Sequence, residues 1–130
     1  IFLEVVTPEK AVVSEEVKIV MAPGTEGEFG VLSGHTPFLT TLKIGALKYV
    51  DASGKQRAVF INEGFAEALP DRVTVLAESA ERRADIDLER AKKAKERAEK
   101  RLAEAADVDF TRASAALYRS ILRISMIETK

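Results

Sequence analysis

The feature that most constrains the fold is the stretch 85–130, in which neither glycine nor proline occurs. A run of this length without a helix-breaking residue predicts helix over most of it. Its first part, from Ile86 to Ala105, is built almost entirely from Ala, Leu, Glu, Lys and Arg, which have high helix propensities. The tetrad at 106–109, Ala-Asp-Val-Asp, interrupts the pattern. We therefore expect two helices that fold back on each other as an antiparallel hairpin.

Aspartates stand where each of these helices is expected to begin. Asp85 and Asp87 precede the first helix, and Asp109 precedes the second. An aspartate at this position accepts a hydrogen bond from an unpaired N–H group of the first helical turn. We expect Asp109 to cap the second helix, and Asp85 or Asp87 to cap the first.

The expected first helix has an apolar stripe that is mostly alanine. Its members recur every three or four residues and are Leu88, Ala91, Ala94, Ala98, Leu102 and Ala105. Small residues let two helices approach closely, but each buries little area, at ~25 cal/mol per Å². We therefore expect this helix to dock only weakly.

The expected second helix carries two apolar stripes and one basic row. The first stripe consists of Phe110, Ala113, Leu117, Ile121 and Ile124, and the second of Ala115, Tyr118, Leu122 and Met126. The basic row consists of Arg112, Arg119 and Arg123. A two-helix hairpin can cover only one apolar stripe, so the other must meet the first domain or a different chain. The arginines are either a docking face for an acidic partner or a solvated face above an ordinary core stripe.

The residues before 85 have a different character, because short apolar runs alternate with turn residues. We expect strands at Phe2–Thr7, Ala11–Ser14, Val17–Ala22, Glu28–Leu32, Phe38–Leu42, Ala46–Val50, Gln56–Asn62, Phe65–Leu69 and Arg72–Ala77. Short strands separated by turn signals favour a sandwich or barrel over alternating strands and helices. The predicted fold is α+β in two parts, with an all-β sandwich or flattened barrel over 1–84 and the helical hairpin over 85–130.

Composition and charge exclude several classes of protein. The chain has no cysteine, which excludes disulfides and thiolate metal sites. Residues 1–80 carry 7 Lys/Arg and 11 Asp/Glu, a net charge of −4, whereas residues 81–130 carry 13 and 10, a net of +3. An acidic body that lacks Trp argues against nucleic-acid binding, which favours clustered basic surfaces with stacking aromatics.

No apolar run approaches the ~18–20 residues that cross a bilayer. The first residues, Ile1–Thr7, lack the basic region of a signal peptide. We therefore expect a cytosolic protein without direct membrane insertion, which meets a membrane only through its partners.

The most unusual stretch before the hairpin is 24–37, where four glycines, the only histidine and a proline fall together. It is not a phosphate-binding loop, because no Gly-Lys-Ser/Thr follows. His35 has no cysteine to share a zinc ion with and no evident nucleophile or orienting acid for catalysis. We expect no enzyme activity, and two roles remain open for His35: contact with a partner, or capping of a turn.

Part of this stretch is recognisable. Residues 27–39, Gly-Glu-Phe-Gly-Val-Leu-Ser-Gly-His-Thr-Pro-Phe-Leu, closely resemble the loop and strand signature of the epsilon subunits of bacterial F-type ATP synthases. The resemblance continues through Gly64–Glu67, Val73–Ala77, Ala80–Arg82, Asp85–Asp87 and both expected helices, and so covers essentially the whole chain. The family commonly has Pro where this chain has Ser33, a departure that affects the stiffness of the loop.

The resemblance implies a non-catalytic, central-stalk subunit of a rotary motor. The β domain would hold the gamma subunit and lie on the ring of c subunits, with Glu28 and His35 near that ring. The hairpin would fold against the β domain, or extend along gamma into the alpha/beta catalytic head and block ATP hydrolysis. Its expected partner contacts are Arg112, Tyr118, Arg119, Leu122, Arg123 and Met126. The complex would hold the chain at the cytoplasmic face of the bacterial cell membrane.

The resemblance also implies a regulatory ligand. Some family members bind ATP in the folded hairpin through an Ile/Leu-Asp-x-x-Arg-Ala motif, which is matched here by Ile86, Asp87, Arg90 and Ala91. The residues that align with the rest of such a site are Glu81, Arg97, Arg119 and Arg123. No cofactor is required, and ATP is expected only as a regulator that favours the closed hairpin. The alternative is that Asp87 merely caps a helix and that the arginines serve the inhibitory contact.

Two other classes of function are weighed against the stalk subunit. A free ATP-sensing module would bind ATP tightly in isolation. A coiled-coil-finger adaptor would carry functional acids at the hairpin tip, such as Asp107 and Asp109, and no second apolar stripe on its second helix. An enzyme is the weakest option, because the sequence shows no catalytic triad, metal-ligand set or phosphate loop.

Overall fold

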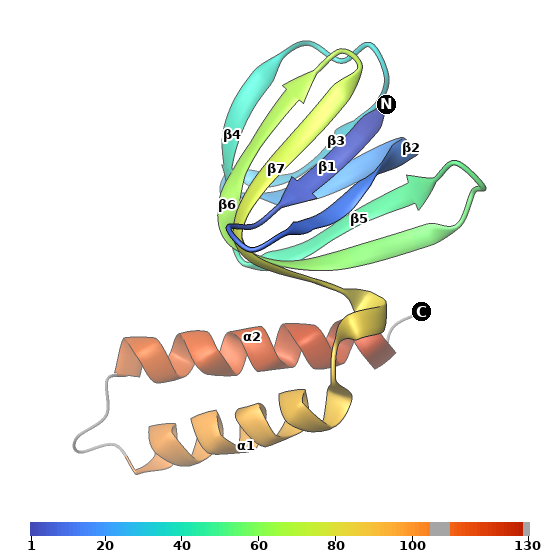
Figure 1. Ribbon diagram of the computed structural model, residues 1–130. Helices are drawn as coiled ribbons and strands as arrows, with labels where there is room; N and C mark the ends of the chain where they lie inside the picture. Colours follow the sequence, from blue (N-terminus) through green and yellow to red (C-terminus); the bar gives the residue numbers. More distant parts are fainter. Residues whose placement is uncertain (105–109, 129–130) are drawn as a thin grey trace. The chain divides into compact units, whose positions relative to one another are not determined.

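The computed structural model describes residues 1–104 and 110–128 and shows seven strands followed by two α-helices (Figure 1). The chain divides into two compact units, Ile1–Arg82 and Arg83–Lys130. The strands are β1 (Phe2–Val6), β2 (Ala11–Gly24), β3 (Gly27–Val31), β4 (Phe38–Leu42), β5 (Gly45–Asp51), β6 (Gln56–Leu69) and β7 (Arg72–Arg82). A 3-10 turn at Arg83–Asp85 precedes the helices α1 (Leu88–Ala103) and α2 (Phe110–Glu128). The predicted two-part α+β fold is confirmed.

Five strands of the first unit form a closed circuit. β1 pairs in parallel with β7, and β7, β6, β5 and β2 follow in antiparallel order, with β2 returning to β1. β4 pairs with the second half of β6, and β3 pairs with the last residues of β2. The result is a flattened barrel, with β3 and β4 attached to longer strands (Figure 1).

The core of this unit follows from the period of two along the strands. In β1, Leu3 and Val5 are fully buried while their neighbours are partly exposed, and in β7 Val73 and Val75 do the same. The inward side chains of all the strands join one cluster, which is mostly valine, leucine and alanine. Apolar burial of this kind stabilises the unit by ~25 cal/mol per Å².

Two of the expected strand breaks are wrong. Ala11–Ser14 and Val17–Ala22 belong to one strand, β2, and Gln56–Asn62 and Phe65–Leu69 belong to another, β6. Polar residues interrupt the apolar pattern in both. The backbone nevertheless continues as one strand, which pairs with a new partner beyond the interruption. β2 pairs first with β1 and then with β5 and β3, and β6 pairs first with β5 and then with β4.

The backbone of β6 is irregular at Glu63, where the strand changes partners from β5 to β4. The register with β7 is the same on both sides of Glu63, with Asn62 opposite Ser79 and Gly64 opposite Ala77, but Glu63 itself has no pairing partner on β7. Glu63 has a φ of 59°, in the left-handed region that most side chains avoid. A Cβ at Gly64 would overlap the carbonyl oxygen of Leu76, so only glycine fits beside it.

The second unit is the expected antiparallel hairpin (Figure 1). α1 begins at Leu88, and Asp87 caps it by accepting a hydrogen bond from the N–H of Arg90 at 3.1 Å. Asp85 lies in the preceding 3-10 turn instead. The cap expected of Asp109, and the acids expected at the tip, lie outside the described residues.

The buried face of the hairpin is made mostly of small residues. On α1 it consists of Ala91 and Ala98, seven residues apart, as the alanine stripe predicted. On α2 the buried residues are Ala113, Ser120 and Met126. Neither predicted apolar stripe of α2 is buried as a whole, because Phe110, Tyr118 and Ile121 are 72%, 47% and 45% exposed. Ser120 was not foreseen, since a serine gives no apolar signal in the sequence.

Candidate functional sites

The stretch of glycines around His35 forms a groove on the β unit. β3 pairs only with β2, and β4 pairs with β6 and touches β2 at a single position, Gly24–Leu42. In the described part of the chain, β3 and β4 are therefore not paired with each other. A groove of about 520 Å³ lies there, lined by Gly24, Glu26, Gly27, Glu28, Phe29, Gly30, His35, Phe38, Leu39 and Thr40.

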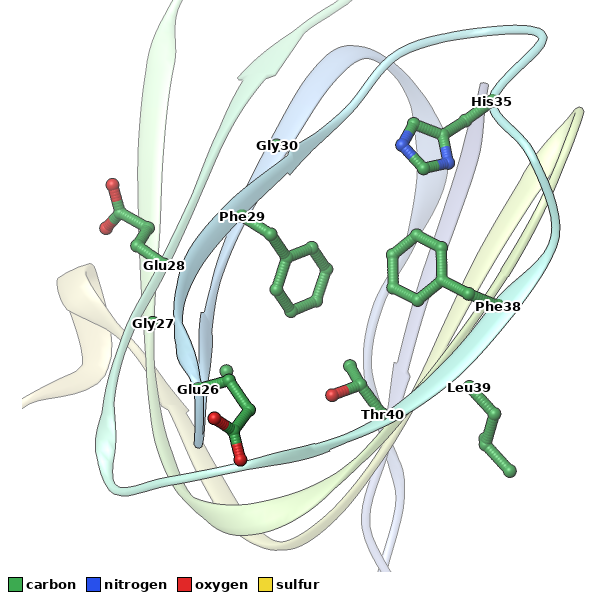
Figure 2. A pocket seen from close by; sticks show the side chains of 10 residues that line it. Glu26, Gly27, Glu28, Phe29, Gly30, His35, Phe38, Leu39 and Thr40 are labelled. Carbon is green, nitrogen blue, oxygen red and sulfur yellow. The ribbon is translucent and has the colours of Figure 1, made fainter.

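Aromatic side chains form the walls of this β3–β4 groove. Phe29 and Phe38 face each other from the two strands, edge to face, with their ring centroids 5.2 Å apart (Figure 2). Glu26 lies at one end of the groove and His35 at the other, whereas the Glu28 side chain points away from it (Figure 2). Near Glu26 the two strands are joined by Thr25, whose N–H donates to the carbonyl oxygen of Thr41 at 3.1 Å.

The position of His35 is compatible with both roles that the sequence left open, namely capping of a turn and contact with a partner. Its ring Nδ1 lies 2.8 Å from the carbonyl oxygen of Thr36, which can only accept a hydrogen bond, so Nδ1 carries the proton. Its ring also packs edge to face on Phe38, with centroids 5.0 Å apart. The turn-binding role is thus present, and Nε2 is the ring atom left to contact a partner.

A second candidate site lies along α1. Seven residues line a hollow of about 760 Å³: Asp87, Glu89, Arg90, Lys93, Glu96, Arg97 and Lys100. Its four basic residues, at 90, 93, 97 and 100, follow helical spacing and therefore share one face. Such a row favours anions, and guanidinium groups bind phosphate bidentately.

The hollow contains three of the residues expected to bind ATP, namely Asp87, Arg90 and Arg97. The other members of the expected set lie elsewhere. Ile86 and Ala91 are buried, Arg119 and Arg123 are half-buried on α2, and Glu81 is near the end of β7. Asp87 is already engaged as the helix cap, but one carboxylate oxygen makes that bond and the other is left for a ligand.

The residues expected to contact partners from α2 differ in accessibility. Arg112 and Tyr118 are exposed, whereas Arg119, Leu122 and Arg123 are half-buried. Met126 is only 8% exposed, so in this arrangement it is not available to a partner. An exposed apolar set remains on the helix, consisting of Phe110, Tyr118 and Ile121.

A third candidate surface lies on the outer side of the sheet and was not foreseen from the sequence. Leu39, Phe65, Leu69 and Leu76 are 71%, 54%, 36% and 55% exposed. They come from β4, β6 and β7, and Phe65 lies directly opposite Leu76 in the register. The alternation of residues could have indicated them, because they share the parity of the outward-facing positions. We call these four residues the outer apolar face.

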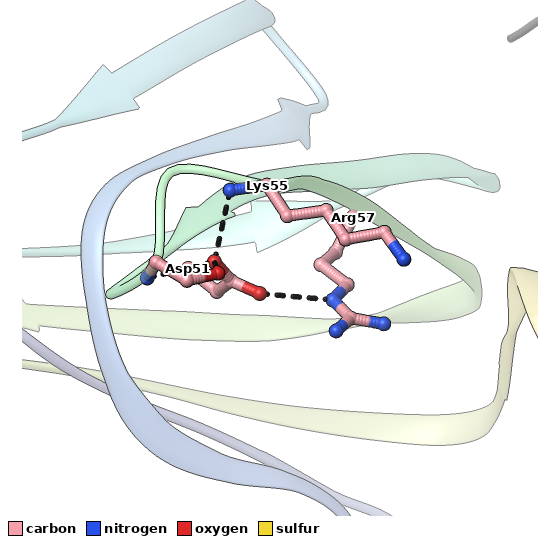
Figure 3. Close-up of polar contacts among 4 residues, drawn as sticks. Asp51, Lys55 and Arg57 are labelled. Atoms are coloured by element: carbon pink, nitrogen blue, oxygen red, sulfur yellow. Dashed lines mark hydrogen bonds and ion pairs between the residues drawn. The ribbon is translucent and has the colours of Figure 1, made fainter.

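One further polar cluster shapes the β unit. Asp51 accepts hydrogen bonds from the N–H and hydroxyl of Ser53, at 3.0 and 2.6 Å. It also accepts from the N–H of Lys55 at 2.9 Å and from Nε of Arg57 at 3.1 Å (Figure 3). These bonds hold the pKa of Asp51 well below its usual range. The cluster closes the turn between β5 and β6 and offers no open ligand position.

Within residues 1–104 and 110–128, no three His, Asp or Glu side chains are placed to share a metal ion. None of the described helices is long and apolar enough to span a membrane.

Taken together, these observations define a class of protein: a small β-sandwich or flattened barrel with an exposed apolar face, followed by a two-helix hairpin. Two family models match the chain in that order. The beta-sandwich domain of the ATP synthase delta/epsilon chain matches residues 1–83, and the long alpha-helix domain of the same chain matches residues 84–128. The protein therefore belongs to the ATP synthase delta/epsilon chain family.

Individual relatives agree with this membership. The chain is 66% identical to the ATP synthase epsilon chain of Desulforapulum autotrophicum, over all of this chain and 97% of the relative. It is 58% identical to that of Nitratidesulfovibrio vulgaris strain Hildenborough, over 94% of this chain and 91% of the relative. These matches favour the stalk-subunit interpretation over the free sensor and the adaptor.

Solved structures share the fold. A chain of the Euglena gracilis mitochondrial ATP synthase, in its OSCP/F1/c-ring assembly, aligns with a TM-score of 0.71 and 25% identity, covering 98% of this chain and 77% of that chain. A chain of the Tetrahymena thermophila mitochondrial ATP synthase central stalk and c-ring aligns with a TM-score of 0.55, covering 99% of this chain and 96% of that chain. At 14% identity the second likeness concerns the fold alone.

Proposed function

We propose that this chain is a rotor subunit of a bacterial F-type ATP synthase, where it joins gamma to the c-ring and restrains ATP hydrolysis with its helical hairpin. The observation that carries the proposal is the match to both epsilon-chain domains in order, with 66% identity to an epsilon chain over the whole length. The subunit performs no chemistry itself, and the complex holds it at the cytoplasmic face of the cell membrane.

The outer apolar face supports a permanent contact with gamma. Phe65 and Leu76 form a cross-strand pair, both are more than half exposed, and Leu39 lies on the strand beside Phe65. Contiguous exposed apolar side chains of this size mark interaction sites in stable proteins. A large obligate partner covers such a face best, because it removes the apolar area from water permanently.

The packing of the hairpin supports the proposal that it inhibits ATP hydrolysis reversibly. The side chains buried most completely on its facing helices include Ala91, Ala98, Ala113 and Ser120, which bury little apolar area and separate at low cost. Phe110, Tyr118 and Ile121 provide exposed apolar contacts for a second resting place. A segment with two docking sites of similar free energy acts as a switch, because a small difference in binding shifts its population.

ATP, as a regulatory ligand of the α1 hollow, would bias that switch. Arg90 and Arg97 are the phosphate-binding candidates, and the free oxygen of Asp87 is a hydrogen-bond acceptor for the adenine amino group. A ligand held by the folded hairpin favours the folded state by its differential affinity for it.

The decisive experiment is reconstitution. Purified chain added to a complex that lacks this subunit should restore coupling and lower ATP hydrolysis, while a version ending at residue 84 should couple without lowering hydrolysis. The same truncated chain carrying Phe65→Ser and Leu76→Ser should bind gamma at least ~10-fold more weakly. A full-length chain that neither joins the complex nor alters hydrolysis would disprove the proposed function.

A further inference from the structure

One unpaired strand edge of the β unit lies along the β3–β4 groove. Each of the five strands in the circuit, β1, β7, β6, β5 and β2, pairs with two neighbouring strands. β3 has one partner, β2, and its other edge borders the groove. An unpaired strand edge is a template for pairing with another extended chain, and soluble proteins usually protect it.

The pairing register shows which backbone groups point into this opening. Gly24 and Gly27 close the two-residue turn between β2 and β3, so their backbone groups bond each other. Backbone direction alternates along a strand, and the groups of Gly27, Phe29 and Val31 therefore point to β2. Those of Glu28 and Gly30 point to the free edge, where β3 has no partner among the described residues.

Gly30 is a second, independent indication that another backbone approaches here. Its φ does not lie in the left-handed region, and a Cβ added to it would come no closer than 3.9 Å to any atom of the chain. Neither conformation nor packing within this protein therefore requires a glycine at position 30 of β3. A strand glycine of this kind marks a place where a ligand or another backbone comes close.

The charge and shape of the β3–β4 groove indicate which kind of segment it could bind. Glu26 lies at one end of the groove, and neither it nor Glu28 forms an ion pair or hydrogen bond through its carboxylate among the described residues (Figure 2). The walls between are the rings of Phe29 and Phe38. An extended segment with an apolar side chain in the middle and a basic one at the end complements this surface.

We propose that the β3–β4 groove receives an extended segment of a neighbouring subunit, which pairs with the free edge of β3 and places a lysine or arginine against Glu26. This inference rests on the proposed function, which supplies the neighbouring subunit. Backbone pairing with Glu28 and Gly30 fixes the register, and Glu26 selects the basic residue.

Hydrogen–deuterium exchange tests the backbone pairing directly. The exchange of β3 is compared between the isolated chain and the reconstituted ATP synthase. The amides of Glu28 and Gly30 should exchange at least ~10-fold more slowly in the complex, whereas those of Phe29 and Val31 are already bonded to β2 and should change little. Equal exchange of Glu28 and Gly30 in the two samples, with the chain bound, overturns the inference but leaves the proposed function intact.

Two substitutions at Gly30 separate strand pairing from simple contact. Gly30→Pro removes the outward N–H donor, which an edge strand tolerates, and should weaken association with the complex at least ~10-fold. Gly30→Ala keeps the donor but adds a Cβ where the other backbone comes close, so it should weaken association clearly less than Gly30→Pro does. Equal losses would mean that the bulk at position 30 matters and not the hydrogen bond, which overturns the inference.

Glu26→Gln tests the charge. It should weaken association and reduce its salt dependence, while Glu9→Gln, an exposed acid outside the groove, should change neither. An isolated chain that already protects Glu28 and Gly30, and sediments as a dimer, would assign the groove to a second copy and overturn the inference. A wild-type chain that joins no complex overturns both the inference and the proposed function.

Discussion

Asp51 binds Arg57 across the turn that joins β5 and β6, with the guanidinium Nε donating to Oδ2 at 3.1 Å. The other carboxylate oxygen accepts from Ser53 and Lys55. The four bonds fix the two strands whose pairing closes the barrel, so one side chain holds a turn that the rest of the circuit needs.

The lowered pKa of Asp51 predicts a pH dependence of stability. The pKa is lower in the folded chain than in the unfolded chain, chiefly because the Ser53 hydroxyl and the Lys55 N–H bond the carboxylate. The stabilisation is therefore complete above the unfolded pKa of ~4 and is lost as the pH falls toward the folded value. Urea denaturation should show a smaller loss of stability between pH 7 and pH 3 for Asp51→Asn than for the wild type. Parallel pH profiles would contradict the assignment.

The irregular backbone of β6 at Glu63 and Gly64 predicts opposite effects of substitution at these adjacent positions. The left-handed conformation of Glu63 is unfavourable for a residue that has a Cβ. Glu63→Gly should therefore stabilise the chain by up to ~1 kcal/mol. The measurement is the free energy of unfolding by urea, with Glu67→Gly, in the regular part of the same strand, as the control that should destabilise.

Gly64→Ala should do the reverse. Its Cβ would overlap the Leu76 carbonyl, and relief requires β6 and β7 to separate, at ~1–3 kcal/mol or more. Thermal melting of the purified chain measures the loss. A wild-type melting temperature would mean that β6 and β7 can accommodate a Cβ at position 64 without cost.

Because mostly small side chains are buried between the two helices, we expect position 120 to tolerate only a small residue. Its hydroxyl donates to the carbonyl oxygen of Ala116 in its own helix at 2.9 Å, so Ser120→Ala should cost less than ~1 kcal/mol. Ser120→Leu overfills a position that is 1% exposed and should cost ~1–3 kcal/mol. Proteolysis of the helical unit should be faster for Ser120→Leu and unchanged for Ser125→Leu, at an exposed position of the same helix.

Asp87 allows capping and nucleotide binding to be separated. Asp87→Ser keeps a good cap but removes the carboxylate, whereas Asp87→Ala loses both, at ~1 kcal/mol of helix stability. If the proposed ATP site exists, both variants weaken ATP binding to the isolated chain in calorimetry, but only Asp87→Ala lowers helicity. Arg97→Ala should also weaken binding, and Arg101→Ala, outside the hollow, should not. Absence of binding to the wild type at millimolar ATP would remove the nucleotide site.

Substitution of Arg119 tests whether the hairpin inhibits ATP hydrolysis through its basic row. Replacing it by alanine should raise ATP hydrolysis by the reconstituted motor several-fold if the basic row meets acidic residues of the catalytic head. Lys92→Ala, a charge removed from α1, should leave hydrolysis unchanged. An unaltered rate for Arg119→Ala would argue that the arginine serves only the folded hairpin.

Local patterns in the sequence determined much of this protein. The absence of glycine and proline after residue 84, and the alanines at helical spacing, specify the hairpin and the α1 half of its seam, because helix formation depends on neighbours three and four residues away. Turn residues likewise marked most strand ends. The segment 27–39 carried the family resemblance.

Only the tertiary structure decided how distant segments meet. Strand pairing joins residues far apart in the chain, so the sequence did not reveal that β2 and β6 run on past their polar stretches or that β1 closes a circuit with β7. The same holds for the β3–β4 groove, whose walls come from strands that share no pairing. Ser120 was hidden for a related reason, since close packing of helices rewards small size and not hydrophobicity.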